Sequence, residues 1–168
     1  IIDQSNKDDI NQLFDDVFSN LDFKVKIINF DKNEYKDEIN LDYNKDIFGN
    51  LSSLFKCFNI GKQSKNDLIF FLEDDYLHKE TLIEEMVMTY ERISSQLNKE
   101  LILVPSDYPY LYMKERKTNI FAGSHRHWQS LDKILCSFMT SNEILNNYWD
   151  NFKLTCQDHN DPIEKYLN

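Results

Sequence analysis

The sequence predicts an α/β fold, with helices covering a parallel or mixed sheet, in a single domain of 168 residues. Strand-like and helix-like patterns alternate through about the first hundred residues, which is typical of layered α/β sheets. Residues 67–72 contain five consecutive apolar residues and are expected to form a strand buried on both faces. Hydrophobic residues make up 41% of the chain, enough for a packed core despite a mean hydropathy of -0.59.

The first half of the chain shows the clearest pattern. A helix is expected at 5–21, because this segment starts with a capping box and continues with an apolar stripe of helical spacing. Residues 24–30 alternate in polarity and predict a strand, whereas the charged residues 31–46 predict a long loop. A second helix is expected at 51–60, with Gly61 as its C-terminal stop.

The pattern becomes less regular after the buried strand at 67–72. A helix is expected at 79–97 and a buried strand at 101–104, whereas residues 105–130 are aromatic, charged and irregular. Shorter elements are expected beyond them, namely a strand at 135–139 and helices at 142–148 and 162–167. The inward stripe of the 79–97 helix is expected to consist of Leu82, Ile83, Met86, Tyr90, Ile93 and Leu97.

Composition argues against several classes of protein. The net charge of -10 and the pI of about 4.8 disfavour nucleic-acid binding, which depends on Lys and Arg neutralising phosphates. The three cysteines are widely spaced, so reduced thiols and a cytoplasmic protein are expected rather than disulfides or zinc. Apolar runs fall far short of the ~20 residues of a membrane span, so none is expected. The chain opens on Ile1-Ile2-Asp3, like the tail of a buried strand, and is expected to lack an N-terminal segment.

An acidic triplet, Glu73-Asp74-Asp75, directly follows the buried strand. Ligands of open α/β sheets bind beyond the carboxyl ends of the strands. Neighbouring carboxylates repel one another, and Mg²⁺ or Mn²⁺ relieves this repulsion, because such cations are commonly held by one or two carboxylates together with substrate phosphates. A short acidic motif also fits an ordinary solvated loop, but its place after the strand favours a metal and diphosphate site.

The order of these segments resembles that of family 2-type glycosyltransferases with the GT-A fold. The resemblance rests on I-I-D-Q-S at the start, G-N-L-S-S-L-F in the second helix, D-L-I-F-F-L-E-D-D-Y-L around the triplet and L-I-L-V-P in the later strand. It implies a GT-A-like three-layer α/β/α fold with a mixed, mostly parallel central sheet. Residues 1–104 would then form a nucleotide-binding half, and residues 105–168 an acceptor and catalytic half.

The resemblance also implies a reaction and the residues that serve it. A sugar would move from a nucleoside diphosphate donor of the UDP or GDP type to a hydroxyl of a glycan or small-molecule acceptor, usually with inversion. Asp3 would contact the nucleotide base, and Glu73 and Asp74 would bind the nucleotide. Asp75 would bind Mn²⁺ or Mg²⁺, with Glu73, where many relatives carry Asp, as a second candidate metal ligand. Considered without the family, Asp3 is better explained by capping of the first helix.

An inverting transfer needs a general base that takes the proton of the acceptor hydroxyl. The resembled family uses an acidic residue in a late E-D or D-D motif, and the candidates here are Asp158 and, as the alternate, Asp161. Asp158 follows Gln157, which departs from the acidic first position of that motif. Asp161 precedes Pro162 and fits a helix N-cap better than a catalytic base.

Basic residues gather in one later segment, 114–127. Arg126 is a candidate ligand of the donor phosphates, because Arg binds phosphate oxygens in a bidentate fork. It equally fits a solvated loop, which is the preferred interpretation of Lys114 and Lys117. The histidines of this half, His125, His127 and His159, are candidates to complete a metal shell or to stabilise the leaving group.

Aromatic residues in the same half are candidates for an acceptor cleft, since sugar rings stack on aromatic faces. The proposed cleft residues are Tyr108 and Trp128, together with Asp107 at the end of its strand. The aromatic residues also fit simple packing of an irregular segment over the sheet.

Two other functions stay open. The first is a non-catalytic glycosyltransferase-like module of a larger glycan-assembly protein. The second is a phosphotransfer enzyme with an acidic Mg²⁺ site, which fits less well. Haloacid-dehalogenase-like phosphatases begin their motif with a nucleophilic Asp where this chain has Glu73, and response-regulator receivers place their acidic pair after the first strand.

Overall fold

The structure is a computed structural model that describes residues 2–3, 18, 22–39, 47–106, 108–113, 115, 117–132, 134, 137–157 and 166–167. The helix expected at 5–21 lies outside the described residues except for Phe18, which is helical. The helix expected at 162–167 also lies outside them, except for residues 166–167, which belong to a 3₁₀ turn.

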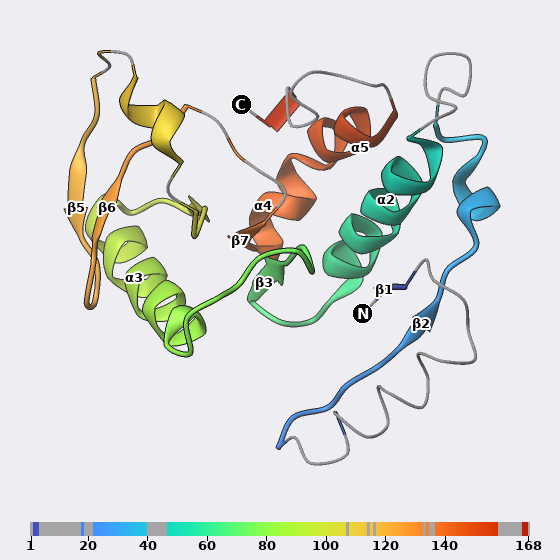
Figure 1. The fold of residues 1–168 in the computed structure, drawn as a ribbon, viewed down its shortest axis with the longest axis horizontal. Coiled ribbons are helices and arrows are strands. Elements are labelled where there is room, and N and C mark those ends of the chain that lie inside the picture. Colours follow the sequence, from blue (N-terminus) through green and yellow to red (C-terminus); the bar gives the residue numbers. More distant parts are fainter. Residues whose placement is uncertain are drawn as a thin grey trace.

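A three-stranded antiparallel sheet lies at the centre of the described chain (Figure 1). Its strand order is β3 (Leu68–Phe71), β7 (Phe138–Ser141) and β4 (Ile102–Leu103). Phe71 pairs with Phe138 and Leu103 pairs with Met139, so β7 runs antiparallel to both neighbours. The outer strands β3 and β4 therefore run in the same direction, and their carboxyl ends lie at the same edge of the sheet.

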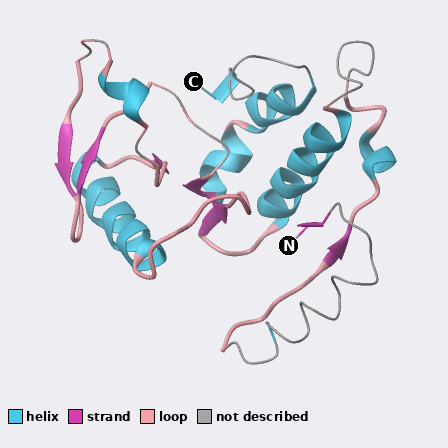
Figure 2. Cartoon of the chain, viewed as in Figure 1, coloured by secondary structure: helices cyan, strands magenta, loops and turns pink. Residues whose placement is uncertain are grey.

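Two strand pairs lie outside this sheet (Figure 2). Strand β1 (Ile2–Asp3) pairs in parallel with β2 (Ile28–Asn29), which is much shorter than the strand expected at 24–30. Strands β5 (Ile120–Ala122) and β6 (His127–Gln129) form an antiparallel hairpin, in the segment that was expected to be irregular.

The prediction of a GT-A-like fold with a mostly parallel central sheet is wrong. The described strands are short, and the central sheet is antiparallel throughout. The cause is β7, which inserts between β3 and β4. A strand was expected at 135–139, and β7 overlaps it at Phe138 and Met139, but its central position was not expected. The hydroxyls of its polar residues are satisfied, since Thr140 Oγ1 donates to the Leu101 carbonyl and Ser141 Oγ accepts from the Ile144 N–H.

Helices cover both faces of the central sheet (Figure 1). One face carries α2, α4 and α5, and the other carries α3 with the β5–β6 hairpin. The Asn142 side-chain amide donates to the carbonyls of Gly61, Lys62 and Ser64, which joins the end of α2 to the start of α4. The helices are α2 (Phe48–Gln63), α3 (Leu82–Leu97), α4 (Asn142–Asn147) and α5 (Trp149–Gln157), with 3₁₀ helices η1 (Lys32–Tyr35) and η2 (Pro109–Tyr112).

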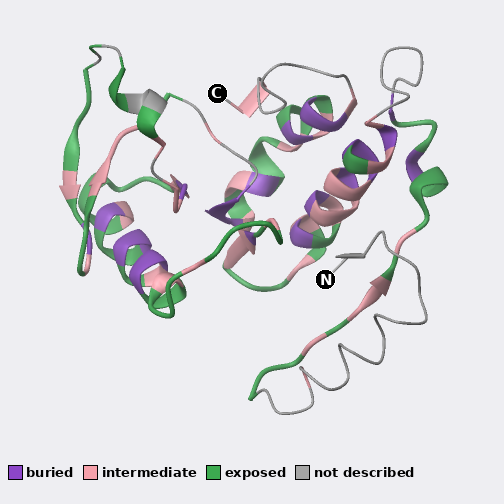
Figure 3. Cartoon of the chain, viewed as in Figure 1, coloured by how far each residue is buried: buried purple, intermediate pink, exposed green. Residues whose placement is uncertain are grey.

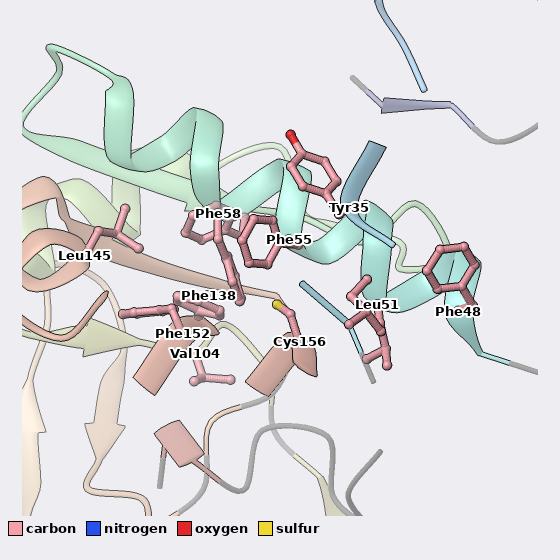
Figure 4. Packing of buried hydrophobic residues seen from close by; sticks show 12 residues of the cluster. Tyr35, Phe48, Leu51, Phe55, Phe58, Val104, Phe138, Leu145, Phe152 and Cys156 are labelled. Carbon is pink, nitrogen blue, oxygen red and sulfur yellow. The ribbon is translucent and has the colours of Figure 1, made fainter. Parts of the chain in front are cut away.

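Aromatic side chains fill the core beneath α2, α4 and α5 (Figure 4). Phe58 of α2 is 1% exposed, and its ring centroid lies 5.0 Å from those of both Phe71 and Phe152. Phe138 of β7 is fully buried, 5.0 Å from Phe71. Alternate strand residues face this side, so the period of two along a strand builds a single aromatic layer.

The opposite face of the sheet has a smaller core. It consists of Met86 and Tyr90 from α3 with Leu103 and Met139 from the sheet. Tyr90 Oη donates to the Glu100 carboxylate at 2.7 Å and accepts the Leu101 N–H at 3.1 Å, which fastens the end of α3 to the start of β4. Buried residues recur along α3 (Figure 3), and Met86 and Tyr90 among them belong to this core.

Two details of the helices correct the sequence interpretation. Gly61 does not stop α2, which continues to Gln63; instead, a Cβ at Gly61 would lie 2.8 Å from Phe71 Cζ, so glycine permits close packing of helix on strand. The inward stripe of α3 was also partly wrong. Ile83 and Leu97 are 53% and 43% exposed, whereas Glu85 is only 6% exposed.

Candidate functional site

The acidic triplet lies in the loop that follows β3, at the sheet edge where the carboxyl ends of β3 and β4 meet. The Glu73 N–H donates to Ser137 Oγ at 3.0 Å, and Ser137, which is buried, immediately precedes β7. This bond attaches the start of the triplet to the sheet. Glu73 is half-buried, whereas Asp74 and Asp75 are exposed, so the carboxylates of the last two residues face solvent.

A pair of tyrosines joins the ends of the two outer strands. Tyr76 follows the triplet and Tyr108 follows β4, and their hydroxyls lie 2.6 Å apart. The pKa of Tyr76 lies well above its usual range, first because of this hydrogen bond, then because of partial burial, and further because of charges on Tyr108, Glu73 and Asp75. The negative charges of Glu73 and Asp75 are the smallest of these causes of the raised pKa. We refer to residues 72–78 together with Tyr108 as the strand-end site.

The loop carrying this site is open to solvent (Figure 3). Leu72 is 55% exposed and Leu77 is fully exposed, so apolar side chains flank the carboxylates on both sides. These two exposed aliphatic side chains lie close to the acids in the sequence. They are too few to form a large apolar patch.

The carboxylate oxygens of the site are suitable ligands for a hard divalent cation, but they do not fill its coordination shell. Carboxylate oxygens are the ligands that Mg²⁺ and Mn²⁺ prefer. No group of three or more His, Cys, Asp and Glu side chains among the described residues is arranged to hold a metal ion. A cation would therefore be held by one or two carboxylates of the triplet and would take its remaining ligands from water or from the phosphates of a bound molecule.

His125 and Arg126 of the basic segment lie on the turn of the β5–β6 hairpin, on the α3 side of the sheet, and His127 begins β6. The side chains of His125, Arg126 and His127 are exposed. No hydrogen bond or ion pair joins the Arg126 side chain to the triplet among the described residues. Lys117 is also exposed, and Lys114 lies outside the described residues.

Glu85 of α3 holds this turn in place, and the sequence interpretation missed it. Its carboxylate accepts the N–H of His125 at 2.7 Å, the N–H of Arg126 at 3.2 Å and Trp128 Nε1–H at 3.0 Å. Thr89 Oγ1 donates to it as well, at 3.1 Å. Burial alone would raise the pKa of Glu85, but these hydrogen bonds outweigh burial and lower it. The sequence did contain a sign of this role, because Glu85 occupies an inward-facing position of the helix between Leu82 and Met86.

Trp128 is placed by the same contacts. Its indole is half-buried against the core of Met86, Tyr90, Leu103 and Met139, with Nε1 bonded to Glu85. In this arrangement Trp128 packs the hairpin onto α3. Of the two described residues assigned to an acceptor cleft, Tyr108 and Trp128, Tyr108 lies beside the triplet through its bond to Tyr76.

Several expected site residues lie outside the described part of the chain. These are Asp107, Asp158, His159 and Asp161. Asp3 belongs to β1, and its backbone pairs with Asn29 of β2. The assignment of a catalytic base and of a base-binding residue therefore stays a prediction from the sequence.

Comparisons of the chain with protein-family models, with curated proteins and with solved structures give no match. No helix of the described residues is long and apolar enough to cross a membrane.

Proposed function

We propose that the chain is a metal-dependent glycosyltransferase that binds a nucleoside diphosphate sugar at the strand-end site. The observation that supports this proposal is the position of Glu73-Asp74-Asp75 at the shared carboxyl edge of β3 and β4, beside the Tyr76–Tyr108 pair. The proposal depends on this local arrangement and does not require the parallel sheet that the sequence predicted.

An anionic nucleotide can bind to this acidic chain if a cation lies between them. Asp75 and Glu73 would hold Mg²⁺ or Mn²⁺ by one or two carboxylate oxygens, and the diphosphate would complete the shell. The cation would supply neutralisation of charge on the departing diphosphate. Because the protein ligands are few, we expect weak binding of the cation alone and mutual strengthening of cation and nucleotide binding.

The transfer step would be a displacement at the anomeric carbon. The acceptor hydroxyl forms the new C–O bond, the bond to the diphosphate breaks, and a base takes the hydroxyl proton. Asp158 is the proposed base and Asp161 the alternate. Tyr108, whose hydroxyl bonds to Tyr76 beside the triplet, is the proposed acceptor contact.

Titration calorimetry and melting-temperature shifts test whether the chain binds nucleotide sugars. UDP- and GDP-sugars are expected to bind in the presence of Mn²⁺ and not after its removal with a chelator. Asp75→Asn should weaken metal-dependent nucleotide binding at least tenfold, because a charged ligand of the cation is lost. Asp67→Asn is the matched control, since Asp67 is an exposed aspartate just before the opposite end of β3.

Two outcomes would redirect the proposal. Absence of binding for every nucleotide sugar tested, with and without Mn²⁺, rules out the transferase. Metal-dependent binding without sugar transfer to any acceptor, or donor hydrolysis, supports the non-catalytic binding module instead.

A further inference from the structure

One buried polar atom stands out among the described residues. His78 Nε2 is buried and has no hydrogen-bond partner. Such an atom has lost its hydrogen bond to water on burial and has gained none from the protein, which destabilises the folded state. Most buried polar side-chain atoms are hydrogen-bonded, so an exception calls for a physical reason.

His78 belongs to the strand-end site. It lies three residues after Asp75, in the loop between β3 and α3. Its ring centroid lies 6.5 Å from that of Phe70 and 6.2 Å from that of Tyr76. The imidazole is thus next to the tyrosine whose hydroxyl joins the ends of β3 and β4.

The two rings beside His78 differ in how firmly they are held. Phe70 is part of β3, pairs with Met139 of β7, and packs against the core on the α3 side. Tyr76 lies outside the regular elements, is 37% exposed, and its hydroxyl bond to Tyr108 is exposed to solvent. Of the two, Tyr76 is held less firmly, and moving it breaks one solvent-exposed hydrogen bond, the one to Tyr108.

The side chains of the site offer few hydrogen-bond donors. Carboxylates and phosphate oxygens are both acceptors, so the carboxylates of the triplet can meet a phosphate only through a cation. The hydroxyls of Tyr76 and Tyr108 are already bonded to each other. A neutral imidazole can present an N–H at Nε2, and this nitrogen has no competing partner.

We propose that His78 is a ligand-binding residue of the strand-end site, where Nε2–H donates a hydrogen bond to a phosphate oxygen of the bound nucleotide after Tyr76 shifts aside. This inference rests on the proposed binding of a nucleoside diphosphate, and it adds a residue that contacts the phosphate directly. The hydrogen bond pairs Nε2 in the complex and leaves it unpaired in the free protein, so it favours the bound state.

Two substitutions at position 78 separate this role from a role in folding. His78→Phe keeps an aromatic ring and removes the nitrogen, whereas His78→Gln keeps an N–H donor. Calorimetric titrations with UDP and then GDP, each with Mn²⁺, should show affinity about tenfold lower for His78→Phe and within about threefold of wild type for His78→Gln. The melting temperature of ligand-free His78→Phe should equal or exceed that of wild type, because the unpaired atom is gone.

Imidazole nitrogen NMR provides an independent readout. The Nε2 signal of His78 should change on addition of UDP or GDP with Mg²⁺, a diamagnetic substitute for Mn²⁺, and the change should be absent with Mg²⁺ alone. If wild type and His78→Phe bind the nucleotides equally, this inference is overturned while the proposed function stands. If wild type binds neither nucleotide, the proposed function fails and the inference fails with it.

Discussion

The two faces of the central sheet are stabilised in different ways. On the face covered by α2, α4 and α5, aromatic rings such as Phe58, Phe138 and Phe152 pack against one another. On the face covered by α3, one buried carboxylate, Glu85, fastens the β5–β6 hairpin through several hydrogen bonds. The stabilisation from packing is spread over many weak contacts. The stabilisation from hydrogen bonds to a charge depends on a few single atoms. The aromatic face should therefore respond to lost volume, and the α3 face to single polar groups and to pH.

The largest effect is expected on the aromatic face. Phe58→Ala should lower the free energy of unfolding by about 4 kcal/mol, because it removes a fully buried ring from contact with Phe71 and Phe152. Denaturant unfolding followed by circular dichroism measures this loss. Ile83→Ala, at an exposed position of α3, is the control and should change stability by less than about 0.5 kcal/mol. Similar losses for the two variants would contradict the assignment of Phe58 to the main core.

The spacing of apolar residues along a short segment predicts whether that segment forms a helix or a strand, and it predicted four of the elements. The helix α3 and the strands β3 and β4 lie within the segments expected for them, whereas α2 extends three residues beyond each end of the expected 51–60. Strand order is not local. The central place of β7 depends on buried hydroxyls of Thr140 and Ser141 finding partners far along the chain or in the next helix, which no short pattern reveals.

The candidate site divides in the same way. The apolar residues just before the triplet predicted that it follows a strand, and in the structure it follows β3. The approach of Tyr76 to Tyr108 depends on β3 and β4 lying on either side of β7. The expected parallel sheet had no such strand between them. Glu85 was missed because an acid within an apolar stripe is usually assigned to the solvent side, and only its hydrogen-bond partners 40 or more residues away make burial tolerable.

A substitution of Glu85 tests the polar side of the comparison. Glu85→Ala should cost about 3 kcal/mol, because it leaves the donors of the hairpin turn without an acceptor. Glu85→Gln keeps one acceptor oxygen and should cost about half as much. Trp128 reports the change directly, since its indole N–H bonds to Glu85, so its fluorescence should shift when the hairpin is released. Glu84→Gln, at the exposed neighbouring position, is the matched control and should have little effect.

The same carboxylate predicts a dependence on pH with a definite sign. The pKa of Glu85 is lower in the folded chain than its ordinary value of 4.5, because the hydrogen bonds outweigh the effect of burial. Its contribution to stability is therefore complete above about pH 4.5 and is lost as the pH falls through the lowered value. The difference in unfolding free energy between wild type and Glu85→Gln should shrink as the pH falls below 4.5. A difference that stays constant down to acid unfolding would show that the charge of Glu85 is unimportant.

The smallest effects compare one glycine from each face. A Cβ at Gly123 would lie 2.5 Å from Trp128 Nε1 and 2.6 Å from Thr89 Oγ1, so Gly123→Ala would push apart groups that bond to Glu85. A Cβ at Gly61 would lie 2.8 Å from the tip of the Phe71 ring, which can tilt, and alanine also favours the helix by up to about 1 kcal/mol. We expect losses of about 2 kcal/mol for Gly123→Ala and about 1 kcal/mol or less for Gly61→Ala. Denaturant unfolding measures both, and a larger loss at Gly61 would mean that the aromatic face is the less adaptable of the two.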